Sequence, residues 1–381
     1  MKRVYWRPPG VSRAALTMIA LIALIAVVAV EALPVQEKQR YYAEKIAAAK
    51  LALRAMAEIK AEKARLGLKP DPEGDPYGTG LIGVPLSAVT SNTGYLTAKQ
   101  TSVNPNFAAV VVHLLKRAGV AAGDTVALGV SGSFPALNID AFAACQVLGL
   151  KPIVIASASA SEWGANNPEF LWIDMEHHLS EKGLFGFRSV AASLGGIDDK
   201  GFGMSKEGRS LLDAAIERNG LEKITPRSIV DSIDKRLSIY ERLAGDRPIK
   251  AYVNVGGGTA SVGTHVGKKE FEPGLNLAPP RKDTLMDSVM LRFAERDVPV
   301  IHLTNITKLA ENNGLPLDPK GIPPVGEGTI YVRAEYNRWL AGAGLAVVFA
   351  AMLAFIRLDV GSRLLATTRK KRDGTQPQQM I

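Results

Sequence analysis

Two long apolar stretches lie near the ends of the chain. Residues 14–30 and residues 340–356 each run for seventeen positions without a charged side chain. Seventeen helical residues are about the minimum for crossing ~30 Å of hydrocarbon at 1.5 Å per residue. We therefore predict transmembrane helices over residues 14–33 and 338–357. The alternatives are a cleaved signal peptide for the first stretch and a buried helix of a soluble domain for the second.

Between these stretches the apolar pattern becomes periodic. Residues 35–68 are rich in Ala, Glu, Lys and Arg and carry apolar side chains at three- and four-residue intervals, which predicts an amphipathic stalk helix. The Pro- and Gly-rich residues 69–80 then predict turns. We assign residues 69–335 to one globular domain.

Within this domain, helical patterns alternate with short, continuously apolar segments. The expected helices cover residues 106–118, 136–148, 207–219, 226–244 and 283–296, and the expected strands cover residues 125–130, 152–156, 250–255 and 298–302. Continuously apolar strands that alternate with helices are typical of parallel sheets buried on both faces. The predicted fold class is therefore α/β, with a largely parallel sheet and flanking helices, between an N-terminal and a C-terminal transmembrane helix.

The distribution of charge predicts an orientation. The net charge is +9, of which +3 lies in residues 1–33 and +4 in residues 340–381, so residues 34–339 carry only +2. Because basic residues flank the cytoplasmic side of membrane helices, we expect residues 1–13 and 358–381 in the cytoplasm. The domain would then lie outside the cytoplasm, anchored to the cell membrane and in contact with the lipid bilayer. Since the basic excess flanks the apolar stretches, we predict no nucleic-acid partner.

Several kinds of site are excluded by composition and motif. Cys145 is the only cysteine, which rules out an intramolecular disulfide and a cysteine-based zinc cluster, and its apolar neighbours predict a buried thiol. The glycine-rich loop at residues 254–264 matches neither the Walker pattern nor the dinucleotide fingerprint. We therefore predict no cofactor and no metal.

Two glycine-rich loops follow predicted strands. The first, residues 129–138, offers backbone N–H groups and hydroxyls to an anion at the carboxyl end of a strand, and the second, residues 254–264, does the same. The candidate ligand contacts are Gly129, Ser131, Gly132, Ser133, Asn138, Asn254, Gly256, Gly257, Gly258 and Thr259. Tight turns are the alternative, with Ser133 capping the next helix and Pro135 in its first turn.

The first loop also resembles a nucleophile elbow. Residues 129–133 depart from G-x-S-x-G only at the last position, which makes Ser131 or Ser133 a candidate nucleophile. In the order serine, acid, histidine, the base would be His265 or His302. This arrangement would make the protein a hydrolase or transferase.

Polar side chains in two other segments could join the same cleft. Residues 157–168 follow another predicted strand and lead to Asp174, Glu176, His177 and His178. Because adjacent histidines point in different directions, we favour a solvated surface over a metal site for these four residues. The turns at residues 91–94 and 101–106 could line the cleft, or the second could cap the helix that begins near Asn106.

Three segments together resemble a known family. They are SNTGYLTAKQTSVNPNFAAVVVHLLKRAGVAAGDTVALGVSGSFPALN, ASASASEWGANNPEFLWIDME and YVNVGGGTASVG, between the two terminal anchors. They are similar to the poly-γ-glutamate system protein family of bacterial membrane proteins, and the resemblance extends over nearly the whole chain. It implies a role in the synthesis and export of poly-γ-glutamate but assigns no catalytic residue.

We therefore expect an accessory membrane protein of poly-γ-glutamate production. Its outer domain would bind the anionic polymer, another carboxylate-bearing ligand, or a membrane synthase subunit. Two alternatives remain: a γ-glutamyl polymer hydrolase or transferase that uses Ser131 or Ser133, and a structural scaffold of a membrane synthase complex.

Overall fold

The computed structural model describes residues 13–256, 258–281 and 285–357, which belong to two compact units. One unit is formed by the two ends of the chain, up to Lys38 and from Val332 onward. The other unit is continuous, from Gln39 to Tyr331.

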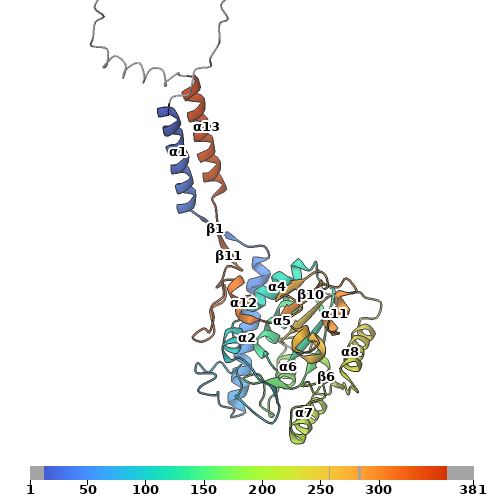
Figure 1. The fold of residues 1–381 in the computed structure, drawn as a ribbon. Helices are drawn as coiled ribbons and strands as arrows, with labels where there is room; N and C mark the ends of the chain where they lie inside the picture. The colour runs from blue at the N-terminus through green and yellow to red at the C-terminus, as the bar shows by residue number, and fades with distance from the viewer. Residues whose placement is uncertain (1–12, 257, 282–284, 358–381) are drawn as a thin grey trace, which may run out of the picture. The chain divides into compact units, whose positions relative to one another are not determined.

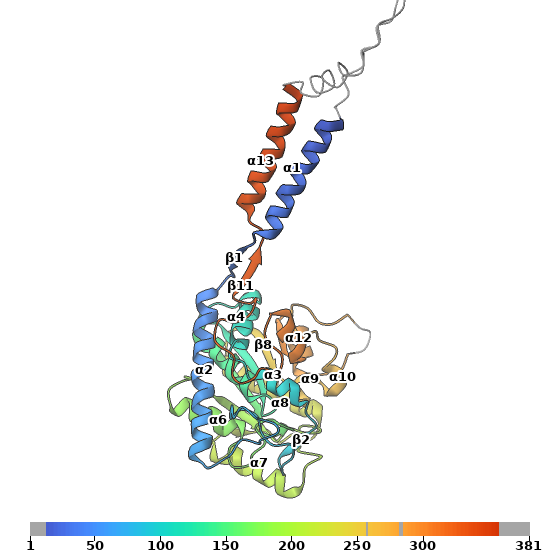
Figure 2. The same ribbon diagram turned by 90° about the vertical axis from the view of Figure 1, so that its left-hand side faces the viewer.

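The terminal unit contains two apolar helices that lie side by side (Figures 1 and 2). They are α1 (Arg13–Ala32) and α13 (Arg338–Arg357). A Cβ atom at Gly344 would come within 3.0 Å of the Ala26 Cβ, so the absence of a side chain lets the two backbones approach closely. By length and composition, both helices could cross a membrane. Antiparallel strands β1 (Val35–Lys38) and β11 (Val332–Glu335) complete the unit.

The central unit is built on a mostly parallel sheet. Within the described residues, seven strands lie in the order β7-β6-β4-β3-β8-β10-β9, all parallel to their neighbours except β9, which is antiparallel to β10. The strands are β3 (Thr125–Ser131), β4 (Lys151–Ser157), β6 (Ser189–Ser193), β7 (Glu222–Lys223), β8 (Ile249–Val255), β9 (Gly274–Asn276) and β10 (Val300–Leu303). A small parallel pair, β2 (Thr90–Asn92) and β5 (Ala160–Ser161), stands apart from this sheet. The α/β class with a largely parallel sheet is therefore confirmed.

Helices cover both faces of the sheet (Figure 1). The helices of the unit are α2 (Tyr42–Arg65), α3 (Leu96–Ser102), α4 (Phe107–Arg117), α5 (Pro135–Val147), α6 (Trp172–Glu181), α7 (Lys206–Arg218), α8 (Ile229–Ala244), α9 (Thr259–Val262), α10 (Thr264–Gly267), α11 (Val289–Ala294) and α12 (Ile306–Asn312). Helices α8, α9 and α11 bury one face, where Tyr240 and Phe293 pack against Tyr252 of β8. Helices α4, α5 and α6 are grouped in a second layer, in which Phe142 contacts Trp172 edge to face.

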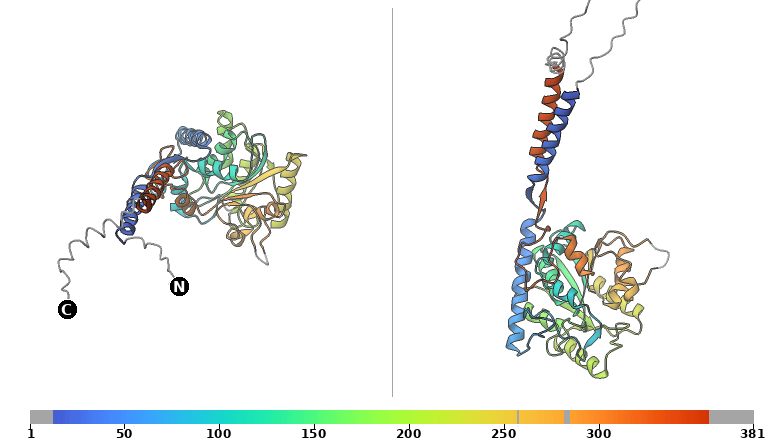
Figure 3. Two further views of the ribbon diagram at one scale, coloured as in Figure 1. Left: turned by 90° about the horizontal axis from the view of Figure 1, so that it is seen from above. Right: turned by 60° about the vertical axis from the view of Figure 1, so that its left-hand side comes forward.

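Helix α2 lies outside this second layer (Figure 3). The sequence predicted one stalk helix over residues 35–68, but residues 35–38 are the strand β1 and the helix begins only at Tyr42. Its small side chains Ala48, Ala52 and Ala55 are fully buried against the unit. Helix α2 is therefore a packed layer of the α/β unit, and its apolar stripe faces the other helices of that unit.

The strand order reverses between β3 and β8. From β3 the chain adds β4, β6 and β7 on one side, and it then returns to place β8 and β10 on the other side. Open α/β sheets bind their ligands in the crevice outside the carboxyl ends of the strands at such a switch point. The two glycine-rich loops follow β3 and β8, so both loops begin at this position.

Candidate functional site

A cleft of about 530 Å³ lies at the carboxyl edge of the sheet, next to the switch point. It is lined by Asn92, Thr93, Gly94, Tyr95, Ala98, Lys99, Ser133, Phe134, Ser161, Ile197, Asp198, Thr259, Val262, Thr264 and Lys268. These residues come from the segments that follow β3, β6 and β8, from Ser161 of β5, and from the segment that runs from β2 into α3. The two glycine-rich loops therefore converge on one cleft.

Two glycines allow this convergence. Gly256 has φ of 86°, in the left-handed region that favours glycine, and a Cβ atom there would come within 3.2 Å of the Ser131 hydroxyl. At Gly129, inside β3, a Cβ atom would collide with the Tyr252 hydroxyl and lie 2.5 Å from the Ser261 Oγ. Because these side chains come from β8 and α9, a methyl group at Gly129 would push the two halves of the site apart.

Lys99 is the most deeply buried cation of the cleft, with 3% of its surface exposed. Its Nζ donates to the Ser133 carbonyl oxygen, lies 2.7 Å from the Ser161 Oγ, and sits 3.9 Å from the centre of the Phe134 ring. Burial, with a smaller contribution from the nearby Lys268, lowers the pKa of Lys99 to about 7, while Glu162 acts in the opposite direction. At neutral pH a substantial fraction of this amine is therefore uncharged.

Lys268 supplies a second cation on the cleft wall. Burial lowers the pKa of its amine. Within the described part of the chain, neither Lys268 nor Lys99 has a carboxylate within ion-pair distance, although fourteen such pairs occur elsewhere, from Arg65–Glu62 to Arg338–Glu335. A partly desolvated ammonium group at Lys268 without a carboxylate in ion-pair distance favours an anionic ligand.

Hydroxyl groups complete the wall of the cleft. The Ser133 Oγ accepts a hydrogen bond from the Ser161 backbone N–H at 3.1 Å, and the Thr259 hydroxyl donates to the Gly196 carbonyl oxygen at 2.8 Å. The expectation that Ser133 caps the following helix is wrong, because Phe134 occupies the capping position and no side chain caps the helix there. Pro135 does lie in the first turn, as predicted.

One member of a buried ion pair lies next to the cleft residue Asp198 in the sequence. Arg236 Nη2 lies 3.1 Å from Asp199 Oδ2 and donates to the Ser193 hydroxyl at 2.6 Å. It also reaches the Ser157 Oγ at 3.3 Å, at the end of β4. Asp198, which directly precedes Asp199, lines the cleft and has φ of 54°. Since non-glycine residues with positive φ are strained, the surrounding contacts must hold this loop in place.

Of the ten predicted ligand contacts, Ser133 and Thr259 line the cleft. Asn138 is fully buried and donates to the Ser131 carbonyl oxygen at 2.8 Å, so it stabilises the end of β3 and does not face the cleft. Asn254 is also buried and donates to the Gly256 carbonyl oxygen at 2.8 Å. Gly129, Ser131, Gly132, Gly256 and Gly258 shape the loops without being part of the lining, and Gly257 lies outside the described residues.

Among the side chains that the structure describes, no histidine contacts Ser131 or Ser133 as a base. His302 is buried, where its Nδ1 lies 2.9 Å from Asn254 Nδ2 and its Nε2 lies 3.2 Å from the Lys268 carbonyl oxygen. Burial lowers the pKa of His302 to about 4. The side chain of His265 lies outside the described part of the structure. Among the described contacts, Ser131 and Ser133 have no histidine partner.

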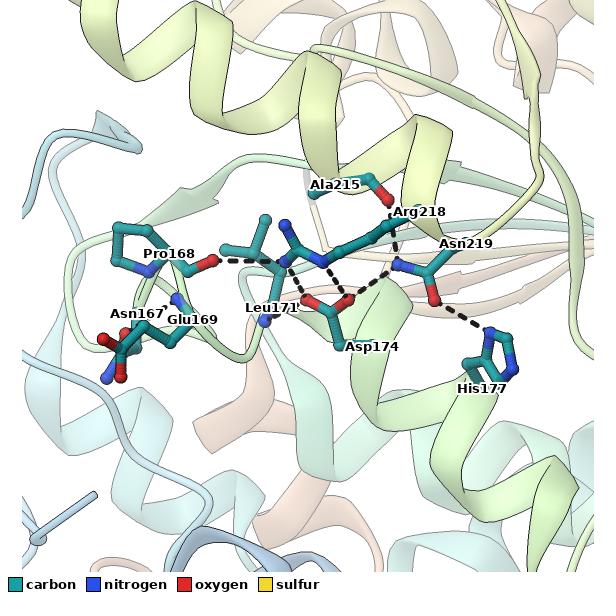
Figure 4. A network of polar contacts seen from close by, with 9 residues as sticks. All are labelled: Asn167, Pro168, Glu169, Leu171, Asp174, His177, Ala215, Arg218 and Asn219. Carbon is teal, nitrogen blue, oxygen red and sulfur yellow. Dashed lines mark hydrogen bonds and ion pairs between the residues drawn. The ribbon is translucent and has the colours of Figure 1, made fainter. Parts of the chain in front are cut away.

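The titratable cluster on α6 is not a metal site within the described residues. Asp174 accepts hydrogen bonds from Arg218 and Asn219, and Asn219 in turn bonds to His177 at 3.0 Å (Figure 4). His178 instead faces Glu58 of α2 at 2.9 Å. The expectation of a solvated surface is wrong for Glu176, which is fully buried and accepts hydrogen bonds from Ser189.

A second cavity of about 1040 Å³ adjoins the cleft. The two share Gly94, Tyr95, Ala98, Phe134 and Lys268 as lining residues. The second cavity adds Lys269 and Lys308, although Lys308 is paired with Glu272 at 3.2 Å. The side chain of Tyr95 is 86% exposed on the shared rim. The combined space is larger than a single small ligand requires.

Three residues of the cleft, Lys99, Lys268 and Tyr95, lie in segments where no sequence pattern predicted a site. Lys99 and Lys268 lie in segments without a pattern that predicts burial, and Tyr95 resembles any exposed aromatic residue. By contrast, residues 92–94 and Ser161 belong to segments that were predicted to line a cleft, and they do line it. The helix-capping alternative for Asn106 is wrong, because its side chain bonds to Gly326 and Tyr331 instead.

In comparisons with known proteins, no family model, no curated protein and no solved structure matches this chain.

Proposed function

We propose that this protein is a membrane-anchored receptor for an extended polycarboxylate, which binds in the cleft of its α/β unit. The family resemblance implies poly-γ-glutamate as the ligand and a role accessory to its synthesis or export. The observation that carries the proposal is Lys268, a cation without a carboxylate partner among the described residues, in one cleft with hydroxyls and loop backbone.

The chemistry of the cleft suits carboxylates. Lys268 offers a charge-assisted hydrogen bond, which is roughly twice as strong as a bond between neutral groups. The hydroxyls of Thr93, Ser133 and Thr264 line the same space and can donate to the remaining carboxylate oxygens. Because residues 34–339 carry a net charge of only +2, the recognition of a polyanion would be local to these residues.

The adjoining cavity supports a chain as ligand instead of a single acid. Lys268 lies where the two cavities meet, and Lys269 continues the basic wall into the larger one. A polymer with regularly spaced carboxylates could place one acidic group against Lys268 and the next against Lys269. The exposed Tyr95 ring would cover the aliphatic part of such a chain.

The apolar helices and their basic flanks support a membrane anchor. Helices α1 and α13 present exposed Leu, Val and Phe side chains that a bilayer would cover, among them Leu21, Leu24, Leu345 and Phe349. With both termini in the cytoplasm, the α/β unit would meet the polymer outside the cytoplasm.

The test is calorimetric titration of the full-length protein in detergent with poly-γ-glutamate oligomers. Lys268→Gln is expected to weaken binding about tenfold or more, because a bond to a charged group contributes about 1.5–3 kcal/mol. The matched control is Lys206→Gln, at an exposed lysine of α7, which should leave affinity unchanged. Equal affinity in wild type and Lys268→Gln would contradict the proposal. Absence of binding in the wild type would favour the scaffold hypothesis.

A further inference from the structure

The Lys99 amine and the Ser161 hydroxyl form a contact of 2.7 Å in the wall of the cleft. Lys99 comes from α3 and Ser161 from β5, segments more than sixty residues apart in the sequence. Lys99 is buried, whereas Ser161 is only partly covered. The hydroxyl can therefore meet a ligand while the amine behind it is shielded from water.

The surroundings of Lys99 favour an uncharged amine. Burial is the main cause, the positive charge of Lys268 adds to it, and the carboxylate of Glu162 opposes it. The face of the Phe134 ring, 3.9 Å from the Nζ, also favours the charged form. With the pKa lowered to about 7, the neutral amine can donate one N–H to the Ser133 carbonyl oxygen and keep its lone pair for the Ser161 hydroxyl. Desolvation of a lysine next to a serine is a recognised way to obtain a general base without histidine.

We propose that Ser161 and Lys99 are the nucleophile and the general base of an acyl-transfer site that cleaves amide bonds in an acidic polymer held in the cleft. The identity of the polymer rests on the proposed function, whereas the dyad rests on its own geometry. Lys268 would bind a carboxylate of the substrate beside the bond to be cut. This site differs from one based on Ser131 or Ser133, which lack a histidine partner among the described contacts.

The reaction balances without a cofactor. The Ser161 Oγ attacks the amide carbonyl carbon while its proton passes to the Lys99 Nζ. The C–N bond then breaks, and Lys99 returns the proton to the departing amine, which leaves an ester on Ser161. Water attacks this ester as Lys99 takes its proton, the acid is released, and the proton returns to the Ser161 Oγ.

Two local features support this role for Ser161. Its backbone N–H donates to the Ser133 Oγ, so the Ser133 hydroxyl hydrogen remains available to the carbonyl oxygen of the substrate. Ser161 also begins a turn closed by the Gly164 N–H at 3.0 Å, in which Trp163 has φ of 62°. An aromatic residue in the left-handed region is an outlier, and such strain is concentrated at functional sites.

The experiment uses the full-length protein in detergent with two probes. The first is γ-glutamyl oligomers of defined length, scored for new amino groups and shorter chains. The second is the p-nitrophenyl ester of a γ-glutamyl dipeptide, scored by release of nitrophenol and by the mass of the acylated Ser161 peptide after acid quench. We expect cleavage whose kcat rises with pH through about 7, as Lys99 loses its proton.

Variants separate catalysis from binding. Ser161→Ala is expected to lower kcat at least ~10³-fold and to abolish the acylated peptide, while calorimetry still detects the oligomer. Lys99→Arg keeps the positive charge but cannot act as a base, so it should lower kcat similarly, and Lys99→Met provides a second, uncharged variant. The matched control is Ser180→Ala on α6, remote from the cleft, which should retain full activity.

The outcomes distinguish this inference from the proposed function. Intact oligomers and no Ser161 adduct, in a wild type that binds the polymer, would overturn the dyad and leave the receptor in place. Cleavage that survives in Ser161→Ala would also overturn the dyad. A Ser161 adduct without detectable binding of the polymer would support the dyad and contradict the receptor.

Discussion

At the scale of single residues, Glu176 has an environment that makes stability depend on pH. Its carboxyl group is fully buried on α6, where it accepts hydrogen bonds from the Ser189 N–H and hydroxyl. Burial raises the pKa of Glu176 from 4.5 to about 8. The folded protein therefore holds a proton that the unfolded chain releases, and the free energy of unfolding falls as pH rises from about 4.5 to 8.

Glu176→Gln should remove this dependence. The variant keeps the shape and the hydrogen-bonding capacity but does not titrate, so wild type and variant should differ by up to about 3 kcal/mol more at pH 8 than at pH 5. Thermal unfolding at both pH values measures this change. The buried Asp140, whose pKa is also raised, is present in both proteins and cancels in the comparison. The same pH dependence in both proteins would show that Glu176 is ionised in the fold.

The sequence predicted the place of a cleft residue correctly where that place follows from the neighbouring strand. Ser133 and Thr259 follow apolar strands, and such loops lie at the carboxyl edge of the sheet by topology alone. Lys99 lies in the cleft through the contact of its Nζ with the Phe134 ring, a long-range contact that periodicity does not encode. Asn138 and Asn254 look like ligand donors in the sequence, but the side-chain amide nitrogen of each donates to a backbone carbonyl oxygen of its own loop.

At the scale of elements, the close approach of α2 depends on small side chains. Ala52 is fully buried where α2 packs on α4 and α5, whereas Ala57 is exposed on the same helix. Ala52→Leu should destabilise the fold by about 1–3 kcal/mol, because the extra carbons overfill a packed interface. Ala57→Leu, the same change on the solvent side, should be nearly neutral. Thermal unfolding of both variants is the measurement, and equal effects would contradict the packed position of α2.

Apolar segments bounded by turn residues were predicted within one residue at each end, such as α4, α5, β3 and β8. The strand β6 was missed, because its sequence SVAAS has small side chains and no apolar run. The helix expected over residues 283–296 is shorter, Val289–Ala294, and residues 282–284 lie outside the described structure. The stalk prediction failed at its start because β1 pairs with β11, a partner almost three hundred residues away.

At the scale of the whole molecule, the first and the last residue of the α/β unit are neighbours in space. The Gln39 N–H donates to the Tyr331 carbonyl oxygen at 2.8 Å, at the two boundaries of the unit. A domain whose chain enters and leaves together can be inserted between two membrane helices without distortion. This geometry is compatible with the proposed anchoring by both ends of the chain.

The proposed orientation can be tested by cysteine labelling in intact spheroplasts. The native Cys145 is buried, and burial raises the pKa of its thiol to about 12, so it should give little background. A membrane-impermeant maleimide should label Lys206→Cys, on exposed α7, without permeabilisation. Thr375→Cys, in the basic C-terminal segment, should react only after the membrane is opened. The reverse pattern would place the α/β unit in the cytoplasm, where its cleft could meet only polymer that has not yet been exported.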